Sequence, residues 1–594
     1  MSRVNATIME VTGLLDAGEF ARAQQVLQKT LQRLPQSPEL NNAMAIVLLK
    51  LKDYERGMYF AARACALAPN QPTLLNSLGG LQALSEKNEE AIRTFEKALA
   101  LDPSNNNARI GIANALCAVG RPAAAVDHAR IGLLHNPEDV GMIVRLCSAS
   151  FAAGDAPPVV EWATQCLRRF PEQRNAAVGL SFALNYVDGV SREEIFRAHR
   201  LVGELTEKLI DAEGGVLPPA PNSREPDRRL KIALVSADFK EHSVSYFLEA
   251  IMKHLDRAGY ELWCYSACEK PDARTRYLES LADRWADVAT LDNDTLARRI
   301  REDGIDVAFE LAGHTEGQKL PCFAFRPAPV QVTYCGYPNT TGLTAIGYRL
   351  VDSLTDPPGA ERFHTEKLVR LDPCFLCYTP LPEAPEPAAP AFESRAGQVS
   401  FGSFNTLLKV TDRVVQTWAR LVQAVPGSRL VLKGTQIVGA EGRERFAARL
   451  RAAGLRDEQF HLLTHAKSQA EHLALYREVD IALDPFPYNG TTTTCEAAWM
   501  GLPTVTLEGD SHAGRVGVSL LTAMGLSDLV ARDTDEYVKL AAALAADKDR
   551  LRDLRRNLRD RLRQGPLCDA PAFAQRFGAA VRMMWREWCA GGGR

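Results

Sequence analysis

The chain has 594 residues, of which 46% are hydrophobic and 24% are charged, the composition of an ordinary globular protein rather than a disordered one. At about 150 residues per domain, this length predicts roughly four structural units. The 70 basic and 73 acidic residues give a net charge of -3. A binder of nucleic-acid polymers needs a cationic surplus to displace counterions from phosphates, so the composition argues against that class of partner.

The sequence carries no signal for export or membrane insertion. Residues 1–7 lack the apolar core of a secretory signal, and no later stretch approaches the roughly 18 uninterrupted apolar residues that a membrane span requires. The 13 cysteines are scattered over the whole length, unlike the dense spacing of a disulfide scaffold. We therefore expect a cytoplasmic protein with reduced cysteines and no membrane span.

A 34-residue period marks the first third of the chain. Its most regular positions are the prolines Pro35, Pro69, Pro103, Pro137 and Pro171. Small residues recur in register with these prolines, which predicts close contact between the two helices of a hairpin. Each proline should end the second helix of its pair. This is the tetratricopeptide pattern, which forms a superhelical stack with a concave binding face.

Beyond residue 229, short β-rich runs alternate with helical segments, as in a parallel sheet covered by helices. Proline-rich stretches separate the parts, and the last helix is long enough to pack back across the junction of two lobes. The predicted β-rich runs begin at Lys231, Tyr260, Asp306 and Val330, and then at Val399, Arg429, Phe460, Asp480 and Thr504. The alternation predicts two Rossmann-like lobes.

These patterns divide the chain into an α-solenoid and an α/β region. The predicted parts are a tetratricopeptide array of about five units (1–185), connecting helices and a linker (186–228), a first lobe (229–379), a Pro-rich linker (380–398), a second lobe (399–569) and a C-terminal helix (570–594).

Ligands of open α/β sheets bind beyond the carboxyl ends of the strands, and two histidines follow predicted strands of the first lobe. They are His242 and His314. An imidazole with a pKa near ~6.5 can take a proton from a hydroxyl nucleophile at neutral pH. A capping loop that happens to contain a histidine explains either motif equally well.

Two features of the second lobe suit a phosphate group. Lys409 follows the opening strand, where a point charge could hold a diphosphate, although a solvated surface lysine fits the local pattern as well. Gly490 is followed by four threonines and then by good helix formers, which places backbone amides and hydroxyls at a helix N-terminus. Glu496, one turn further on, could accept hydrogen bonds from ribose hydroxyls.

An acidic pair, Asp292 and Asp294, has the spacing of a metal-binding motif of some sugar transferases. It precedes a helical run beginning at Thr295, so we interpret Asp292 as a helix N-cap. We expect no metal site and no cofactor.

The motifs together resemble glycosyltransferase family 41, which joins tetratricopeptide repeats to a two-lobed nucleotide-sugar transferase of the GT-B type. The segments most similar to its plant SPINDLY branch are 238–247, 313–315, 326–332, 336–342, 374–380 and 490–496. The resemblance therefore implies an α-solenoid followed by a GT-B fold.

The resemblance also implies roles for individual residues. His242 would be a catalytic base or position the acceptor, and Lys409 would bind the diphosphate. The implied donor site comprises Lys409, His472, Gly490, Thr491, Thr492, Thr493 and Glu496, with His314 and Thr406 near the sugar or the acceptor. Thr491 and Thr406 stand where the animal GlcNAc enzymes of the family carry a histidine and a glutamine.

The function implied is an inverting, metal-independent protein O-glycosyltransferase that moves one sugar from GDP-fucose or UDP-GlcNAc to Ser and Thr hydroxyls. Either His242 or a donor phosphate oxygen would take the hydroxyl proton. The implied partners are protein or peptide acceptors in the repeat groove and a second copy bound through the repeats. The alternatives are an inactive tetratricopeptide scaffold that binds nucleotide and partners, and a transferase with a non-protein acceptor.

Overall fold

The structure is a computed structural model that describes residues 3–212, 214–464, 466 and 468–591. Its backbone contacts separate the chain into two units. One contains the residues up to 162 together with 438–444, and the other contains 163–437 and 445–594.

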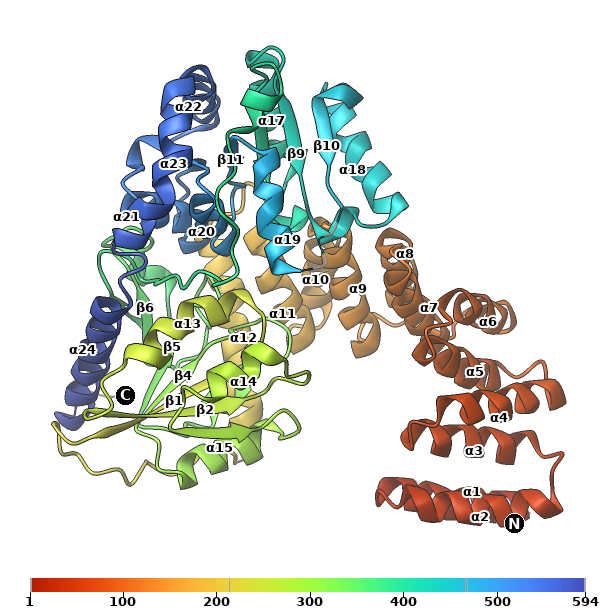
Figure 1. Ribbon diagram of the computed structural model, residues 1–594. Helices are drawn as coiled ribbons and strands as arrows, with labels where there is room; N and C mark the ends of the chain where they lie inside the picture. The colour runs from red at the N-terminus through yellow and green to blue at the C-terminus, as the bar shows by residue number, and fades with distance from the viewer. Residues whose placement is uncertain (1–2, 213, 465, 467, 592–594) are drawn as a thin grey trace. The chain divides into compact units, whose positions relative to one another are not determined.

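The first unit is a stack of antiparallel helix pairs (Figure 1), as the 34-residue period predicts. Each periodic proline lies two residues beyond the second helix of a pair; α2 ends at Arg33, for example, and Pro35 follows. The helices are α1 (Arg3–Asp16), α2 (Phe20–Arg33), α3 (Pro38–Lys50), α4 (Tyr54–Leu67), α5 (Pro72–Leu84), α6 (Asn88–Leu101), α7 (Asn106–Ala118), α8 (Pro122–His135), α9 (Val140–Ala153) and α10 (Pro157–Arg169), the last of which runs into the second unit.

Small side chains let these helices approach one another closely. Ala91 and Ala98 of α6 are fully buried. A Cβ at Gly111 of α7 would lie 2.3 Å from the ring of Phe95, and one at Gly79 of α5 would lie 2.8 Å from it. The two glycines therefore make the room that the buried Phe95 ring needs, which explains part of the small-residue periodicity.

The second unit begins with α11 (Arg174–Ala183), the short η1 (Leu184–Tyr186) and α12 (Arg192–Ala212), and then forms two parallel sheets. The first lobe has the strand order β3-β2-β1-β4-β5-β6-β7. Its strands are β1 (Leu230–Ser236), β2 (Tyr260–Ser266), β3 (Arg284–Asp287), β4 (Val307–Glu310), β5 (Val330–Thr333), β6 (Tyr348–Val351) and β7 (Lys367–Arg370).

The second lobe repeats this plan with the strand order β10-β9-β8-β11-β12-β13. Its strands are β8 (Ser400–Ser403), β9 (Arg429–Leu432), β10 (Phe460–Leu462), β11 (Ile481–Leu483), β12 (Thr504–Leu507) and β13 (Val530–Ala531). All of the described strand pairs in both lobes are parallel. The predicted fold class, a helical repeat array followed by two Rossmann-like lobes, is thus confirmed.

Helices connect the strands of both lobes. They are α13 (Ser243–His254), α14 (Ala273–Glu279), α15 (Asn293–Glu302) and α16 (Leu320–Ala324) in the first lobe, and α17 (Asp412–Ala424), α18 (Ala440–Ala452), α19 (Gln469–Ala474), α20 (Thr492–Trp499), α21 (Val516–Ala523), α22 (Thr534–Ala546) and α23 (Lys548–Gln564) in the second. Asp292 accepts a hydrogen bond from the Thr295 amide at 2.7 Å and caps α15, as predicted.

The C-terminal helix α24 (Ala570–Cys589) returns from the second lobe to the first (Figure 1). The Phe577 ring lies 5.1 Å from Phe309 of β4, and Tyr260 of β2 donates to the Gly578 carbonyl at 2.6 Å. The helix therefore links the two lobes. Within the described ranges, no helix has the length and apolar character to cross a membrane.

Candidate active site

Both sheets reverse their strand order at one place, and a crevice beyond the strand ends at such a place is where α/β folds bind ligands. In the first lobe the reversal lies between β1 and β4; His242 follows β1 and His314 follows β4. In the second lobe it lies between β8 and β11; Lys409 follows β8, and the loop into α20 follows β11. The topology therefore brings the sequence-predicted residues to the two switch points.

Lys409 ends the short helix η4 (Leu407–Lys409) and is half-buried. Its Nζ donates to the Asn489 carbonyl at 2.7 Å and lies 3.8 Å from the centroid of the Tyr488 ring. Tyr186 of η1 packs against the same ring, with centroids 5.0 Å apart. Burial lowers the pKa of Lys409 to about 8, and the negative charge of Asp484 opposes this shift. The site thus holds a poorly solvated cation.

Asp484 shapes the loop between β11 and α20. Its carboxylate accepts hydrogen bonds from the Gly490 amide and the Thr506 hydroxyl, both at 2.6 Å. Burial raises the pKa of Asp484 to about 7, although these bonds favour its ionised form. A Cβ at Gly490 would lie 2.6 Å from Thr493 Oγ1 and 2.9 Å from Asn405 Oδ1. A methyl group at this position would push aside the Thr493 hydroxyl and the Asn405 amide, whose hydrogen bond holds the start of α20.

The N-terminus of α20 points its first amides away from the helix body. The first turn of any helix has amides without intrahelical acceptors, and these carry the positive end of the helix dipole. Thr491 precedes the helix, and its side chain makes no capping bond to the part of α20 that the structure describes. Thr493 instead donates from its hydroxyl to Asn405 Oδ1 at 2.9 Å. The helix end is therefore held next to the loop that follows β8, with its dipole open to an anion.

A buried relay surrounds Glu496, one turn into α20. Lys433, which follows β9, donates from Nζ to His472 Nδ1 at 2.8 Å, and His472 Nε2 lies 3.0 Å from the Glu496 carboxylate. Lysine can only donate, so His472 Nδ1 accepts and the proton of the ring stands on Nε2, which donates to Glu496. The lysine thus fixes the tautomer of the histidine that orients the carboxylate.

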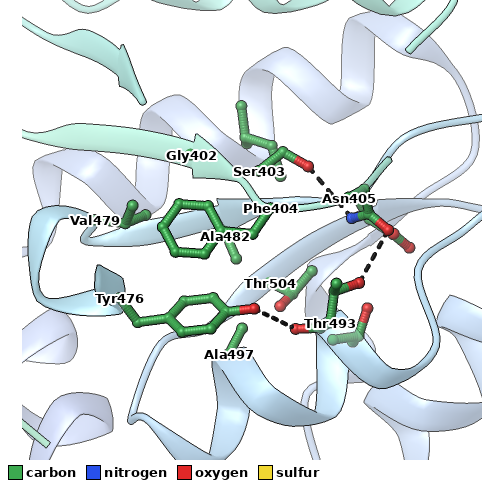
Figure 2. A pocket seen from close by; sticks show the side chains of 13 residues that line it. Gly402, Ser403, Phe404, Asn405, Tyr476, Val479, Ala482, Thr493, Ala497 and Thr504 are labelled. Carbon is green, nitrogen blue, oxygen red and sulfur yellow. Dashed lines mark hydrogen bonds between the residues drawn. The ribbon is translucent and has the colours of Figure 1, made fainter. Parts of the chain in front are cut away.

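Two aromatic rings near this relay, Phe404 and Tyr476, line a small cavity (Figure 2). The Phe404 and Tyr476 ring centroids are 4.5 Å apart, and the Tyr476 hydroxyl donates to the Thr493 carbonyl at 3.2 Å. The cavity between them and Asn405 measures about 10 Å³, room for about one water molecule. It is far too small for a nucleotide, so a nucleotide would have to lie outside this cavity.

His242 is the N-cap residue of α13. Its Nδ1 accepts from the Val244 amide at 3.3 Å and lies 3.6 Å from the Asp238 carboxylate, while 42% of the side chain is exposed. Burial lowers the pKa of His242, and Asp238 opposes that shift. With Nδ1 accepting, the neutral ring carries its proton on Nε2.

The two lobes meet beside His242. Tyr246, one turn along α13, accepts a hydrogen bond from Gln469 Nε2 at 2.9 Å. Gln469 begins α19, the helix that carries His472. The first turns of α13 and α19 are therefore brought together by a direct hydrogen bond.

His314 and Thr406 are more deeply engaged with the protein. His314 Nε2 donates to the Thr341 carbonyl at 2.9 Å, and the ring lies 5.5 Å from His199. Burial lowers the pKa of His314 to about 3, so it is neutral at physiological pH. The Thr406 hydroxyl accepts from Gln436 Nε2 at 3.0 Å.

A second contact between the lobes is a carboxylate shared by two histidines. Asp356 of the first lobe lies 2.5 Å from His512 Nδ1 of the second lobe and 3.1 Å from His364 Nε2. The two histidines hold the pKa of Asp356 far below its usual range, although burial opposes this shift. The contact forms a buried His–Asp–His bridge.

The sequence analysis missed Lys433, Asp484 and Asn405. Lys433 and Asp484 directly follow β9 and β11, and Asn405 is the second residue after β8, so the rule that drew attention to Lys409 applies to them as well. Nothing in the sequence marks Tyr476. Across the described ranges, no group of three or more His, Cys, Asp or Glu side chains is arranged to hold a metal ion.

A helical repeat array joined to two parallel-sheet lobes, with a cation and a helix N-terminus at the second switch point, has the architecture of a GT-B glycosyltransferase. The sequence matches the profile of Glycosyl transferase family 41 over residues 218–378 and 392–577, and that of tetratricopeptide repeats over 14–78 and 83–144. The chain belongs to glycosyltransferase family 41.

Named relatives agree with this membership. A probable UDP-N-acetylglucosamine–peptide N-acetylglucosaminyltransferase SPINDLY of Petunia hybrida is 45% identical over 425 residues, 71% of this chain and 45% of that protein. The relative named SEC of Arabidopsis thaliana is 31% identical over 374 residues, 61% of this chain and 38% of that protein. The chain spans about half the length of the curated relatives it matches. A solved mutant O-GlcNAc transferase of Thermobaculum terrenum superposes with a TM-score of 0.68 and 30% identity over 100% of both chains.

Proposed function

We propose that this protein is an inverting, metal-independent O-glycosyltransferase that moves one sugar from a nucleotide sugar to Ser or Thr hydroxyls of proteins. The observation that carries the proposal is the pairing of half-buried Lys409 with the open N-terminus of α20 at one switch point. Two positive elements fixed in place before any ligand arrives are suited to stabilise charge that develops on a diphosphate leaving group.

The reaction would proceed in one displacement. The acceptor oxygen forms a bond to the anomeric carbon from the side opposite the diphosphate, and the bond from that carbon to the phosphate oxygen breaks. The electron pair of the broken bond goes to the diphosphate beside Lys409. The hydroxyl proton goes to His242 or to a donor phosphate oxygen. Because His242 Nδ1 already accepts from an amide, the present geometry favours a role for Nε2–H in positioning the acceptor and a phosphate oxygen as the base.

The relay around Glu496 would hold the nucleoside. A buried carboxylate oriented by His472 and Tyr476 can accept hydrogen bonds from ribose hydroxyls, and such bonds to a charged group contribute about 1.5–3 kcal/mol each. Replacing Glu496 by Gln should raise the KM for the donor and leave kcat less affected.

Protein acceptors are favoured by the helical repeats, which form extended binding surfaces, and by the names of the relatives, which are peptide transferases. Those names point to UDP-GlcNAc as donor. GDP-fucose remains the second donor candidate. Lys409 and the N-terminus of α20 would supply the positive charge that a metal ion supplies in other transferases. Transfer should therefore persist in the presence of EDTA, which removes divalent metal ions.

The decisive experiment measures transfer to a cytosolic protein extract by mass spectrometry, with UDP-GlcNAc and GDP-fucose in separate reactions. Gly490→Ala is the disabling variant, because its Cβ would break the Thr493–Asn405 hydrogen bond that holds the start of α20. Gly80→Ala in α5 is the matched control, because a Cβ there has no heavy atom within 4 Å among the described residues.

We expect one donor to label Ser or Thr residues with the wild type and with Gly80→Ala, and a loss of about 100-fold with Gly490→Ala, the size of effect of a displaced oxyanion donor. Nucleotide binding without transfer from either donor would support the inactive scaffold instead. Labelling confined to glycans or lipids would support the non-protein acceptor.

A further inference from the structure

A cavity of about 860 Å³ lies in the first lobe, away from both switch points. It is lined by residues that open three strands, namely Val330 of β5, Tyr348 of β6 and Lys367 of β7. These are the amino ends of parallel strands, whereas the candidate active site lies beyond the carboxyl ends. The volume falls in the range of about 300–1,000 Å³ typical of small-molecule sites.

One buried side chain of the cavity wall has an unused hydrogen-bond acceptor. Gln331 is 3% exposed. Its Nε2 donates to the carbonyls of Phe323 at 2.9 Å and Ala345 at 2.8 Å, and two carbonyl partners can be served only by the amide nitrogen. Gln331 Oε1 is therefore the acceptor end, and it has no hydrogen-bond partner in the part of the chain that the structure describes. A buried amide oxygen without a donor costs about 1–3 kcal/mol, which a hydrogen-bond donor on a ligand would offset.

His364 also lines the cavity and has an unused ring nitrogen. Its Nε2 is engaged by Asp356 at 3.1 Å, while its buried Nδ1 lacks a hydrogen-bond partner among the described residues. Because Nε2 donates to a carboxylate, Nδ1 of the neutral ring is an acceptor. The wall thus contributes a second site for a hydroxyl donor.

The cavity is also cationic. Lys367 is bound by the Glu587 carboxylate at 2.8 Å, and Arg200 is bound by Glu204 at 2.9 Å. Arg326 adds a third positive charge to the wall. With Glu587 as the single acidic lining residue, the described lining has three cationic side chains against one anionic side chain.

We propose that this cavity is a second ligand site, separate from the active site, that binds a small hydroxylated anion of the sugar phosphate class. The anionic group would lie against Arg326 and Arg200, and hydroxyl groups would donate to Gln331 Oε1 and His364 Nδ1. An anion without hydroxyl groups would engage only the arginines, and a neutral sugar would engage only the two acceptors.

The test uses isothermal titration calorimetry of the full chain with glucose 6-phosphate, inorganic phosphate and glucose as probes. Lys409→Met serves as a second background, because it disables the proposed diphosphate site without touching the cavity. We expect glucose 6-phosphate to bind both backgrounds equally, and each of the other two probes to bind at least about tenfold more weakly, a difference of about 1.4 kcal/mol.

Two variants of the cavity wall, with a control on the helix that carries Arg200, sharpen the assignment. Arg200→Gln and Arg326→Gln should each weaken glucose 6-phosphate binding about tenfold. Arg197→Gln, on α12 but outside the cavity lining, should leave it unchanged. Absence of glucose 6-phosphate binding, loss of binding in Lys409→Met, equal binding of inorganic phosphate, or unchanged affinity in Arg326→Gln with intact thermal stability would each overturn the proposal.

Discussion

The two lobes share one topology, but the polar side chains at their switch points differ in how fully the protein itself satisfies them. In the first lobe, His314 is bonded to the Thr341 carbonyl, and the buried Glu310 carboxylate accepts the Ala312 and Gly313 amides at 2.8 Å. In the second lobe, Lys409 contacts the Asn489 carbonyl and the Tyr488 ring and feels the charge of Asp484 without a direct ion pair among the described residues, with an open helix end beside it. The comparison teaches that topology decides where polar groups gather, while their neighbours decide whether charge is left for a ligand.

The largest expected effect comes from removing the charge of the second lobe. Lys409→Met should lower kcat/KM about 1,000-fold, because it deletes a preorganised charge at the leaving group. Lys433→Met, which acts only through the tautomer of His472, should lower it about tenfold. Steady-state kinetics with the identified donor measure both. A loss of less than tenfold in Lys409→Met would show that the lysine does not contact the leaving group.

Replacing the exposed histidine of the first lobe should have the next largest effect. We expect His242→Ala to lower kcat about 100-fold with little change in Tm, within the range of general acid–base or positioning groups. His314→Gln should chiefly lower Tm, because its ring is buried and hydrogen-bonded. Thermal melts and kinetics on both variants separate the two roles. The reverse outcome, with stability lost only in His242→Ala, would contradict this assignment.

The bridge between the lobes should contribute to stability rather than to chemistry. Asp356→Asn removes the charge between His512 and His364 and should lower the free energy of unfolding by about 2 kcal/mol, as expected for hydrogen bonds to a charged group. Asp372→Asn is a suitable control, because Asp372 is exposed and its hydrogen bonds to Ser353 lie at the surface. Urea denaturation gives both values. Equal free energies of unfolding for the two variants would show that the bridge does not stabilise the protein.

The smallest predicted effect is on pH dependence. A bound diphosphate raises the pKa of Lys409 from about 8, so nucleotide binding takes up a proton above that pH. The affinity should therefore fall as the pH rises through about 8, by at most about tenfold per pH unit. Lys409→Arg keeps its charge and should show a flat profile. Calorimetry between pH 7 and 9.5 tests this, and a slope in Lys409→Arg equal to that of the wild type would assign it to another group.

Much of the fold could be predicted from hydrophobic patterns. The nine predicted β-rich runs correspond to β1, β2, β4, β5 and β8 to β12. The strands that escaped prediction are β3, β6, β7 and β13: three of them are edge strands, with β3 (Arg284–Asp287) partly exposed and β13 only two residues long, whereas β6 is buried but carries Arg349 in its short run. The edge strands lack a continuous apolar run because they have one neighbouring strand and little length to bury, and the charged residue interrupts the run of β6.

The candidate site was only partly predictable. Lys409 and the threonines could be found because strand ends and helix starts are local features. The relay around Glu496 could not, because Lys433 and His472 are 39 residues apart and His472 and Glu496 are 24 apart. Contacts of that kind depend on the order of strands in the sheet.

The sequence by itself determined the repeat period, the division into two α/β lobes and the polar residues at the strand ends. These follow from local patterns of apolar, small and helix-breaking residues. Only the tertiary structure decided which of those residues keep a charge available and which are already bonded. His242 and His314 look alike in the sequence, yet one is 42% exposed and the other is buried against His199. The physical reason is that burial and hydrogen bonding set the charge state of a side chain, and both come from segments that are distant in the chain.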